Sequence, residues 1–184
     1  MIRMGDVELE ILKTNFFVYI YLGEHGLECS ADLEFWSVPK EINGDSSNFH
    51  ISSHSLAISL PSLELLPGKV FDIGQLVDGE PQMGIYRYEH DPIRDAKLTF
   101  SYWTERGINV SFKGVVDICE EPPLAGNLNL VIDYVLPFNA VVVDEPDTAK
   151  AVEKLQKYFK LSQFHPPEID DVGRQMFSLN GIPY

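Results

Sequence analysis

Apolar and polar side chains alternate every second residue over long stretches of this chain, and this period of two constrains its fold more than any other feature. The alternation is clearest over residues 96–103 and 108–112, which flank the turn-forming residues 104–107. Successive side chains of a strand point to opposite faces of a sheet. The pattern therefore predicts half-buried strands, and the two runs around Gly107 predict a β-hairpin.

The N-terminal part repeats the alternation in three consecutive runs. Residues 7–11, 16–22 and 27–35 each alternate, and we expect them to form an antiparallel meander of three strands. Residues 39–48 and 119–127 are rich in polar, Pro or Gly residues and are expected to be connections. Further strands are expected at residues 49–60, where an imperfect register indicates a bulge, at 128–136 and at 140–143.

The hydrophobic period changes from 2 to 3.6 near the C-terminus. Val152, Leu155 and Phe159 recur at helical spacing within residues 147–161. Asp147 stands where its carboxylate can cap the first turn. This segment is therefore predicted to form one amphipathic helix.

Many short strands followed by one helix indicate a mainly β, α+β fold. We expect antiparallel sheets arranged as a sandwich or a curled barrel, with the amphipathic helix near the C-terminus. A chain of 184 residues is long enough to bury one self-sufficient core. With no internal repeat in sight, residues 1–184 are expected to form a single domain.

The chain is strongly acidic, with 28 Asp and Glu residues against 14 Lys and Arg residues and a formal net charge of -14. Such a chain is repelled by nucleic-acid phosphates and by anionic lipid surfaces. Neither nucleic acid nor membrane is therefore an expected partner, whereas a basic protein would be attracted. Excess carboxylate also serves solubility alone, so charge does not by itself identify a partner.

The N-terminus and the cysteines favour a cytoplasmic location. Acidic residues arrive before any apolar run, so no signal peptide is expected. No apolar stretch approaches the roughly 20 residues that span a bilayer. Cys29 and Cys119 lie far apart, which is more typical of two reduced thiols than of a disulfide framework, although their pairing stays open.

None of the short motifs that mark nucleotide, metal or hydrolase sites occurs in the sequence. His50 and His54 lie four apart in a predicted strand, where about 13 Å would separate them, so a shared metal ion is not expected. Residues 90–95 gather a histidine, two carboxylates and an arginine, for which a turn bonded to its own backbone is the commoner role. No cofactor, metal or catalytic residue is therefore assigned, and enzymatic activity is left open but disfavoured.

The outer face of the predicted meander is the candidate binding surface. Aromatic side chains edged by carboxylates are typical of protein interfaces. The same pattern also arises where another layer covers the aromatic residues. The residues of this face are Glu8, Glu10, Phe17, Tyr19, Tyr21, Glu28, Asp32 and Glu34.

These observations favour a non-catalytic acidic interaction protein that binds a basic protein partner. One concrete form is a toxin-neutralising or immunity-type inhibitor, whose carboxylates would occupy a basic active site. Two alternatives stay open: a β-sandwich that binds a small ligand or carbohydrate, and an enzyme with a dispersed histidine and carboxylate site. A pocket with convergent polar groups would favour either alternative, and a flat acidic, aromatic patch would favour protein binding.

Overall fold

The computed structural model of this chain describes residues 1–57, 63–73, 76–77, 80–88, 90–119 and 123–181. Strands dominate these residues, and the one α-helix among them lies near the C-terminus. The predicted mainly β fold with a C-terminal helix is therefore confirmed.

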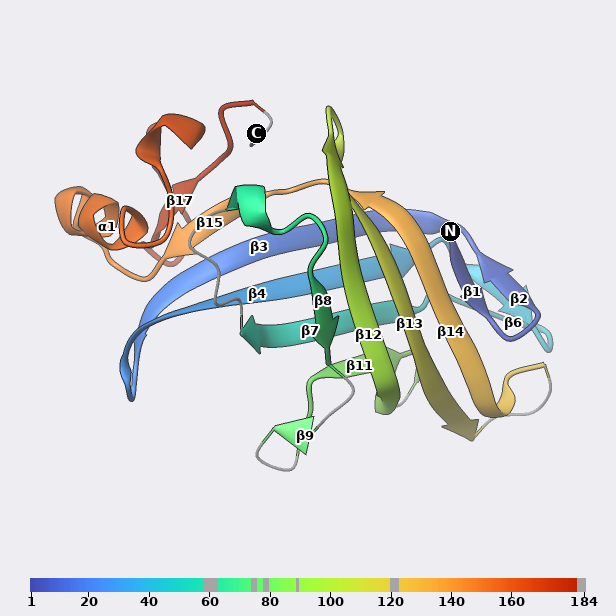
Figure 1. The fold of residues 1–184 in the computed structure, drawn as a ribbon. Helices are drawn as coiled ribbons and strands as arrows, with labels where there is room; N and C mark the ends of the chain where they lie inside the picture. Colours follow the sequence, from blue (N-terminus) through green and yellow to red (C-terminus); the bar gives the residue numbers. More distant parts are fainter. Residues whose placement is uncertain (58–62, 74–75, 78–79, 89, 120–122, 182–184) are drawn as a thin grey trace.

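One long sheet holds most of the chain and curls into a half-barrel (Figure 1). From one edge to the other, its strands are β16 (Glu168–Ile169), β17 (Gln175–Phe177), β15 (Ala140–Val143), β3 (Ile11–Gly23), β4 (Gly26–Ser37), β7 (His50–Ala57), β11 (Met83–Tyr86), β12 (His90–Thr104), β13 (Gly107–Cys119), β14 (Ala125–Leu136), β1 (Ile2–Met4) and β2 (Val7–Leu9). The remaining elements are β8 (Val70–Asp72), which pairs with β12, the hairpins of β5 (Lys40–Ile42) with β6 (Asp45–Ser47) and of β9 (Leu76–Val77) with β10 (Glu80–Pro81), and the short 3-10 helices η1 (Leu63–Leu65) and η2 (Leu161–Gln163).

The hairpin around Gly107 is confirmed, with Thr104 paired to Gly107 at its closed end. Gly107 has a φ of 138°, and a Cβ there would collide with the backbone of Leu136 on β14. The expected connection over residues 119–127 is too long at both ends, because β13 continues to Cys119 and β14 already begins at Ala125. Residues 125–127 are exposed and polar or small, so they pair through the backbone without any apolar alternation to signal it.

The expected polar loop over residues 39–48 contains the β5–β6 hairpin. Asn43 and Gly44 form its turn with φ values of 56° and 80°, the left-handed geometry that a two-residue hairpin favours. The flanking strands carry mostly polar side chains, so their sequence indicates the turn but not the strands. The expected bulge in β7 is confirmed by a register shift between Ala31 and Leu33 of β4.

The three-strand N-terminal meander is wrong in its first strand. β3 and β4 pair along their length as expected. Residues 7–9, however, form β2, which pairs with β1 at the far edge of the sheet. Only Glu10 separates β2 from β3, which is too short a connection to reverse the chain into a hairpin. The other neighbour of β3 is β15, and this pair is parallel, a departure from the antiparallel sheets that we expected.

The core lies between the two halves of the curled sheet. The ring of Phe16 on β3 stacks on Phe100 of β12, with 5.7 Å between ring centroids. Phe71 of β8 meets Phe100 edge-on at 5.8 Å. Because these contacts bury the inner face of β3, the alternate side chains of that strand must point outward. Cys29 faces inward beside Ile20, where it is a free thiol and burial raises its pKa to about 12.

The helix α1 (Thr148–Leu155) is shorter than residues 147–161 but is capped as expected. The Asp147 carboxylate accepts a hydrogen bond from the Lys150 backbone N–H at 3.0 Å. Phe159 is buried beyond the end of the helix, in a turn whose backbone bonds back to Leu155. The Lys154 ammonium of α1 pairs with the Glu145 carboxylate at 3.1 Å.

The packing of α1 leads to a prediction about stability. Leu155→Ala is expected to lower the free energy of unfolding by about 2–5 kcal/mol, because it empties a fully buried position. Lys157→Ala, at an exposed position just beyond the helix, is expected to change it by less than about 0.5 kcal/mol. Urea unfolding followed by circular dichroism measures both, and equal losses would show that α1 packs through another side.

Candidate protein-binding face

The outer face of β3 and β4 displays aromatic side chains next to carboxylates. The aromatic residues come from β3 and the carboxylates from β4, and the two strands pair antiparallel along their length. All of these side chains are half-buried. They are Phe17, Tyr19 and Tyr21 on β3 and Glu28, Asp32 and Glu34 on β4. The structure thus brings together most of the predicted site residues, and we call this set the outer face.

Glu8 and Glu10 do not belong to the outer face. β2 lies at the opposite end of the sheet from β15 and β17 (Figure 1). Along the path of β3, roughly 30 Å of strand separates Glu10 from Tyr19. The Glu8 carbonyl accepts a hydrogen bond from the Lys40 ammonium at 2.6 Å, and both glutamates line a separate hollow with Tyr134. We expected both glutamates beside the aromatic residues because we expected residues 7–11 to pair with the next strand of a meander. Residues 7–9 pair with β1 instead.

Tyr19 stands at the centre of an electrostatic cluster that the sequence did not reveal. The Arg174 guanidinium lies 5.6 Å from the centroid of the Tyr19 ring, a cation–π distance. Arg174 also donates to Asp170 at 2.7 Å. Asp170 in turn accepts from the backbone N–H groups of Val172 and Arg174, so the loop between β16 and β17 holds the guanidinium in place.

A hollow of about 270 Å³ opens beside this cluster. Asp144 reaches it because its backbone N–H bonds to the Ile20 carbonyl at the end of the parallel β15–β3 pairing. Acidic loops usually indicate only solvated surface. No local feature of the sequence therefore predicted that Asp144, or Arg174 in the C-terminal tail, would line a hollow beside Tyr19. The lining residues are Tyr19, Ile20, Tyr21, Ser30, Asp32, Asp144 and Arg174.

The phenols of this hollow are held in their neutral form. Burial raises the pKa of Tyr19 above its ordinary value of 10.0, the charge of Asp32 raises it further, and Arg174 acts in the opposite direction. Burial likewise raises the pKa of Tyr21, and Glu28 adds to the rise. At neutral pH both hydroxyls therefore remain donors, next to carboxylates that can only accept.

The outer face continues to a second aromatic group at the other end of β4. The rings of Trp36 and His50 stack with 4.4 Å between centroids, and the Lys13 ammonium lies 4.9 Å from the centroid of Trp36. Glu34 accepts from the Asn15 amide at 2.8 Å and lies 3.6 Å from His50. Trp36 could have been included from the sequence, because it continues the alternation of β4 by two residues beyond Glu34.

The other sequence candidates for chemistry gain no support in the described part of the chain. Within it, no group of three or more His, Cys, Asp or Glu residues is arranged to hold a metal ion. The side chains of His54 and His90 lie outside the described residues. Residues 90–95 begin β12 rather than forming a turn, and Asp95 takes a φ of 51° at a register shift. Arg94 there donates to Asn127 at 2.6 Å.

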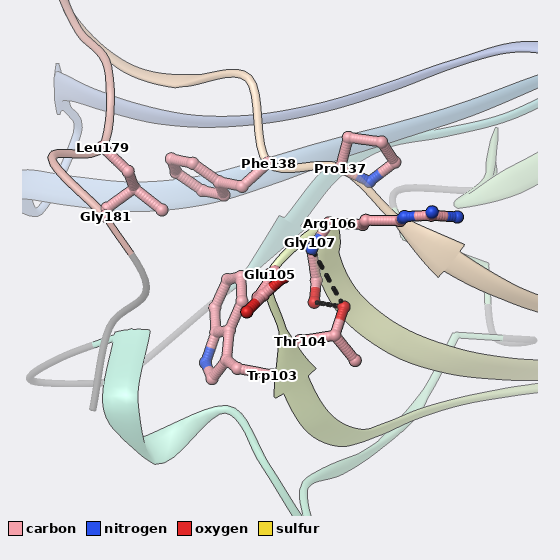
Figure 2. A pocket seen from close by; sticks show the side chains of 9 residues that line it. All are labelled: Trp103, Thr104, Glu105, Arg106, Gly107, Pro137, Phe138, Leu179 and Gly181. Atoms are coloured by element: carbon pink, nitrogen blue, oxygen red, sulfur yellow. Dashed lines mark hydrogen bonds between the residues drawn. The ribbon is translucent and has the colours of Figure 1, made fainter.

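A larger hollow of about 430 Å³ lies at the tip of the β12–β13 hairpin (Figure 2). Trp103 and Glu105 form one side, and Phe138 and Leu179 form the other. Several polar groups here bond within the protein: the Trp103 indole N–H donates to the Leu63 carbonyl at 3.2 Å, and the Thr104 hydroxyl donates to the Gly107 carbonyl at 2.9 Å. The rings of Trp103 and Phe138 therefore offer the main surface on which a ligand could pack in this hollow.

The cluster around Tyr19 predicts how its hydroxyl titrates. We expect a pKa above 10.0 for Tyr19, a lower value in Asp32→Asn, which removes a negative charge, and a higher value in Arg174→Gln, which removes a positive one. NMR of tyrosine labelled with ¹³C at Cζ measures this, with Tyr19→Phe assigning the signal. An ordinary pKa that responds to neither substitution would contradict the geometry.

Comparison with known proteins finds no match for this chain: no family model, no curated protein and no solved structure is significantly similar to it. Among the described residues, no helix has the length and apolar character that crossing a membrane requires. The function is therefore inferred from the geometry of the outer face.

Proposed function

We propose that this protein binds a basic protein partner through the outer face of β3 and β4, without catalysing a reaction. The observation that carries the proposal is the row of half-exposed aromatic side chains beside carboxylates on one continuous strand pair. The alternative was that the C-terminal helix or a loop covers these rings. α1 buries Ala151 and Leu155 in the same core as Phe16. The loop between β16 and β17 places Arg174 over the ring of Tyr19, and the three aromatic side chains of β3 remain half-exposed.

The two kinds of side chain have different tasks in such an interface. Aromatic rings bury a large area at low entropic cost and dominate the energy of interfaces, so Tyr19 and Tyr21 would anchor the partner. Glu28 and Asp32, together with the net charge of -14, would steer a basic partner during diffusion. A toxin-neutralising or immunity-type inhibitor is one concrete form of this function, with carboxylates set into a basic active site.

A second candidate function is binding of a small ligand or carbohydrate at the hairpin-tip hollow of Figure 2. The exposed sides of Trp103 and Phe138, whose rings meet edge-on at 6.3 Å, favour it. Its volume also falls in the range of about 300–1,000 Å³ that ligand pockets occupy. Quenching or enhancement of tryptophan fluorescence by an oligosaccharide, lost in Trp103→Phe, would support this candidate over the first.

The main proposal predicts which substitutions remove the partner. Immobilised protein is expected to retain, from an extract of its native cells, a basic protein that elutes with salt. Tyr19→Ala should lose that protein, because removing an interface anchor raises the dissociation rate by about tenfold or more. Tyr102→Ala, an exposed tyrosine on β12, should retain it. Retention by the first variant and loss by the second would overturn the assignment of the face.

Charge reversals separate steering by the outer face from steering by net charge. With the captured partner, surface plasmon resonance should show a lower association rate for Glu28→Lys at low salt and little effect at high salt. Glu8→Lys changes the net charge equally but lies at the opposite end of the sheet, so its effect should be smaller. Equal effects would mean that the whole charge of the protein, and not this face, attracts the partner.

A further inference from the structure

We infer that the hairpin-tip hollow of Figure 2 binds a quaternary ammonium group, the fully methylated cation carried by choline-type molecules and by trimethylated lysine side chains. This inference does not depend on the outer face. It rests on the second candidate function for the use of this hollow, and it narrows the ligand from small molecules in general to one chemical group.

Two aromatic rings form a fixed corner of the hollow. The planes of the Trp103 and Phe138 rings are inclined at 71°, with 6.3 Å between their centroids. The Trp103 indole N–H donates to the Leu63 carbonyl at 3.2 Å, and Phe138 meets Phe16 of the core edge-on at 5.1 Å. Neither Leu63 nor Phe16 lines the hollow. Because contacts outside the hollow hold both rings, the corner is already in place before a ligand arrives.

The rings of this corner carry no cation of the protein's own. Within the described part of the chain, Lys and Arg side chains lie over other aromatic rings, as Arg174 does over Tyr19, but over neither Trp103 nor Phe138. The face of an aromatic ring is electrostatically negative, and indole attracts cations best. The corner therefore offers a cation a surface that nothing charged yet occupies.

A carboxylate supplies the opposite charge. Glu105 lines the same side of the hollow as Trp103 (Figure 2). It is exposed, and among the residues that the structure describes its carboxylate has no hydrogen bond or ion pair. The side chain of Arg106 extends away from Trp103, toward the Pro137 end of the hollow (Figure 2). The Trp103 end therefore combines aromatic faces with a negative charge, which favours a cation there.

The hydrogen-bonding groups of the hollow favour a quaternary ammonium over a sugar. The Trp103 N–H is engaged by Leu63, and the Thr104 hydroxyl both donates to the Gly107 carbonyl at 2.9 Å and accepts from the Arg106 backbone N–H at 3.2 Å. Arg106 is thus the lining side chain with donors to spare. A buried sugar hydroxyl needs partners, whereas a quaternary ammonium has no N–H and needs only surfaces on which its methyl groups pack.

The experiment titrates choline into the full-length protein labelled with ¹⁵N. The Trp36→Phe background leaves one indole signal, that of Trp103. We expect a saturable shift of this signal and of the backbone signals of Gly107 and Gly181, which line the hollow. The neutral alcohol in which carbon replaces the choline nitrogen has the same shape, and it should bind about tenfold more weakly or worse. A capped trimethyllysine peptide is the second probe: if it binds more tightly than choline, the group belongs to a protein side chain, and if choline binds more tightly, it belongs to a free small molecule.

Two changes test the two sources of attraction. Fluorinated tryptophan at position 103 weakens the negative ring face with little change in size, so choline affinity should fall with each added fluorine. Glu105→Gln should weaken choline binding by about threefold to tenfold, because it removes the negative charge. Glu24→Gln, at an exposed position in the turn between β3 and β4, is the matched control and should leave the affinity unchanged.

The outcomes separate this inference from both candidate functions. No saturable shift with either probe, equal binding of the neutral alcohol, or an affinity that ignores fluorination would overturn it. An oligosaccharide that binds where choline does not would also overturn it and would leave the second candidate function standing. Capture of a basic protein by the outer face is measured separately, and its failure would not change the choline result.

Discussion

The pairing of β3 with β4 on one side and β15 on the other is the constraint on which the rest of the structure depends. It commits every second residue of β3 to the core, where Phe16 meets Phe100 across the interior. The remaining residues of β3 are then obliged to face outward, whatever their chemistry, because a strand has only two faces. The same pairing carries Asp144 to the end of β3 and, through β17, brings Arg174 over Tyr19.

The outer face combines rings that favour burial with carboxylates that favour water. The protein itself satisfies part of both preferences, because Glu34 accepts a hydrogen bond from Asn15 and Arg174 covers one side of the Tyr19 ring. The protein as a whole carries a formal net charge of -14, and an excess of like charge opposes the compact state. A basic partner would bury the rings and reduce that repulsion at once, which links binding to stability.

Local features of the fold could be predicted from the sequence, and non-local ones could not. Gly107 marks the β12–β13 hairpin and Asp147 the start of α1, because each acts on residues within a few positions of itself. The pairing of β2 with β1 and the parallel pairing of β15 with β3 join segments whose own patterns do not name their partners. The candidate site divides in the same way: alternation placed the residues of β3 and β4 correctly on one face, misplaced Glu8, and had no signal for Arg174.

Site-specific photo-crosslinking to the captured partner shows directly whether the outer face is the binding surface. p-Benzoylphenylalanine in place of Tyr21 puts the reactive group on the outer face, and in place of Tyr102 it puts the group on an exposed part of β12. We expect a covalent adduct with the partner from position 21 and none from position 102. An adduct from position 102 alone would contradict this expectation and move the interface to the other half of the sheet.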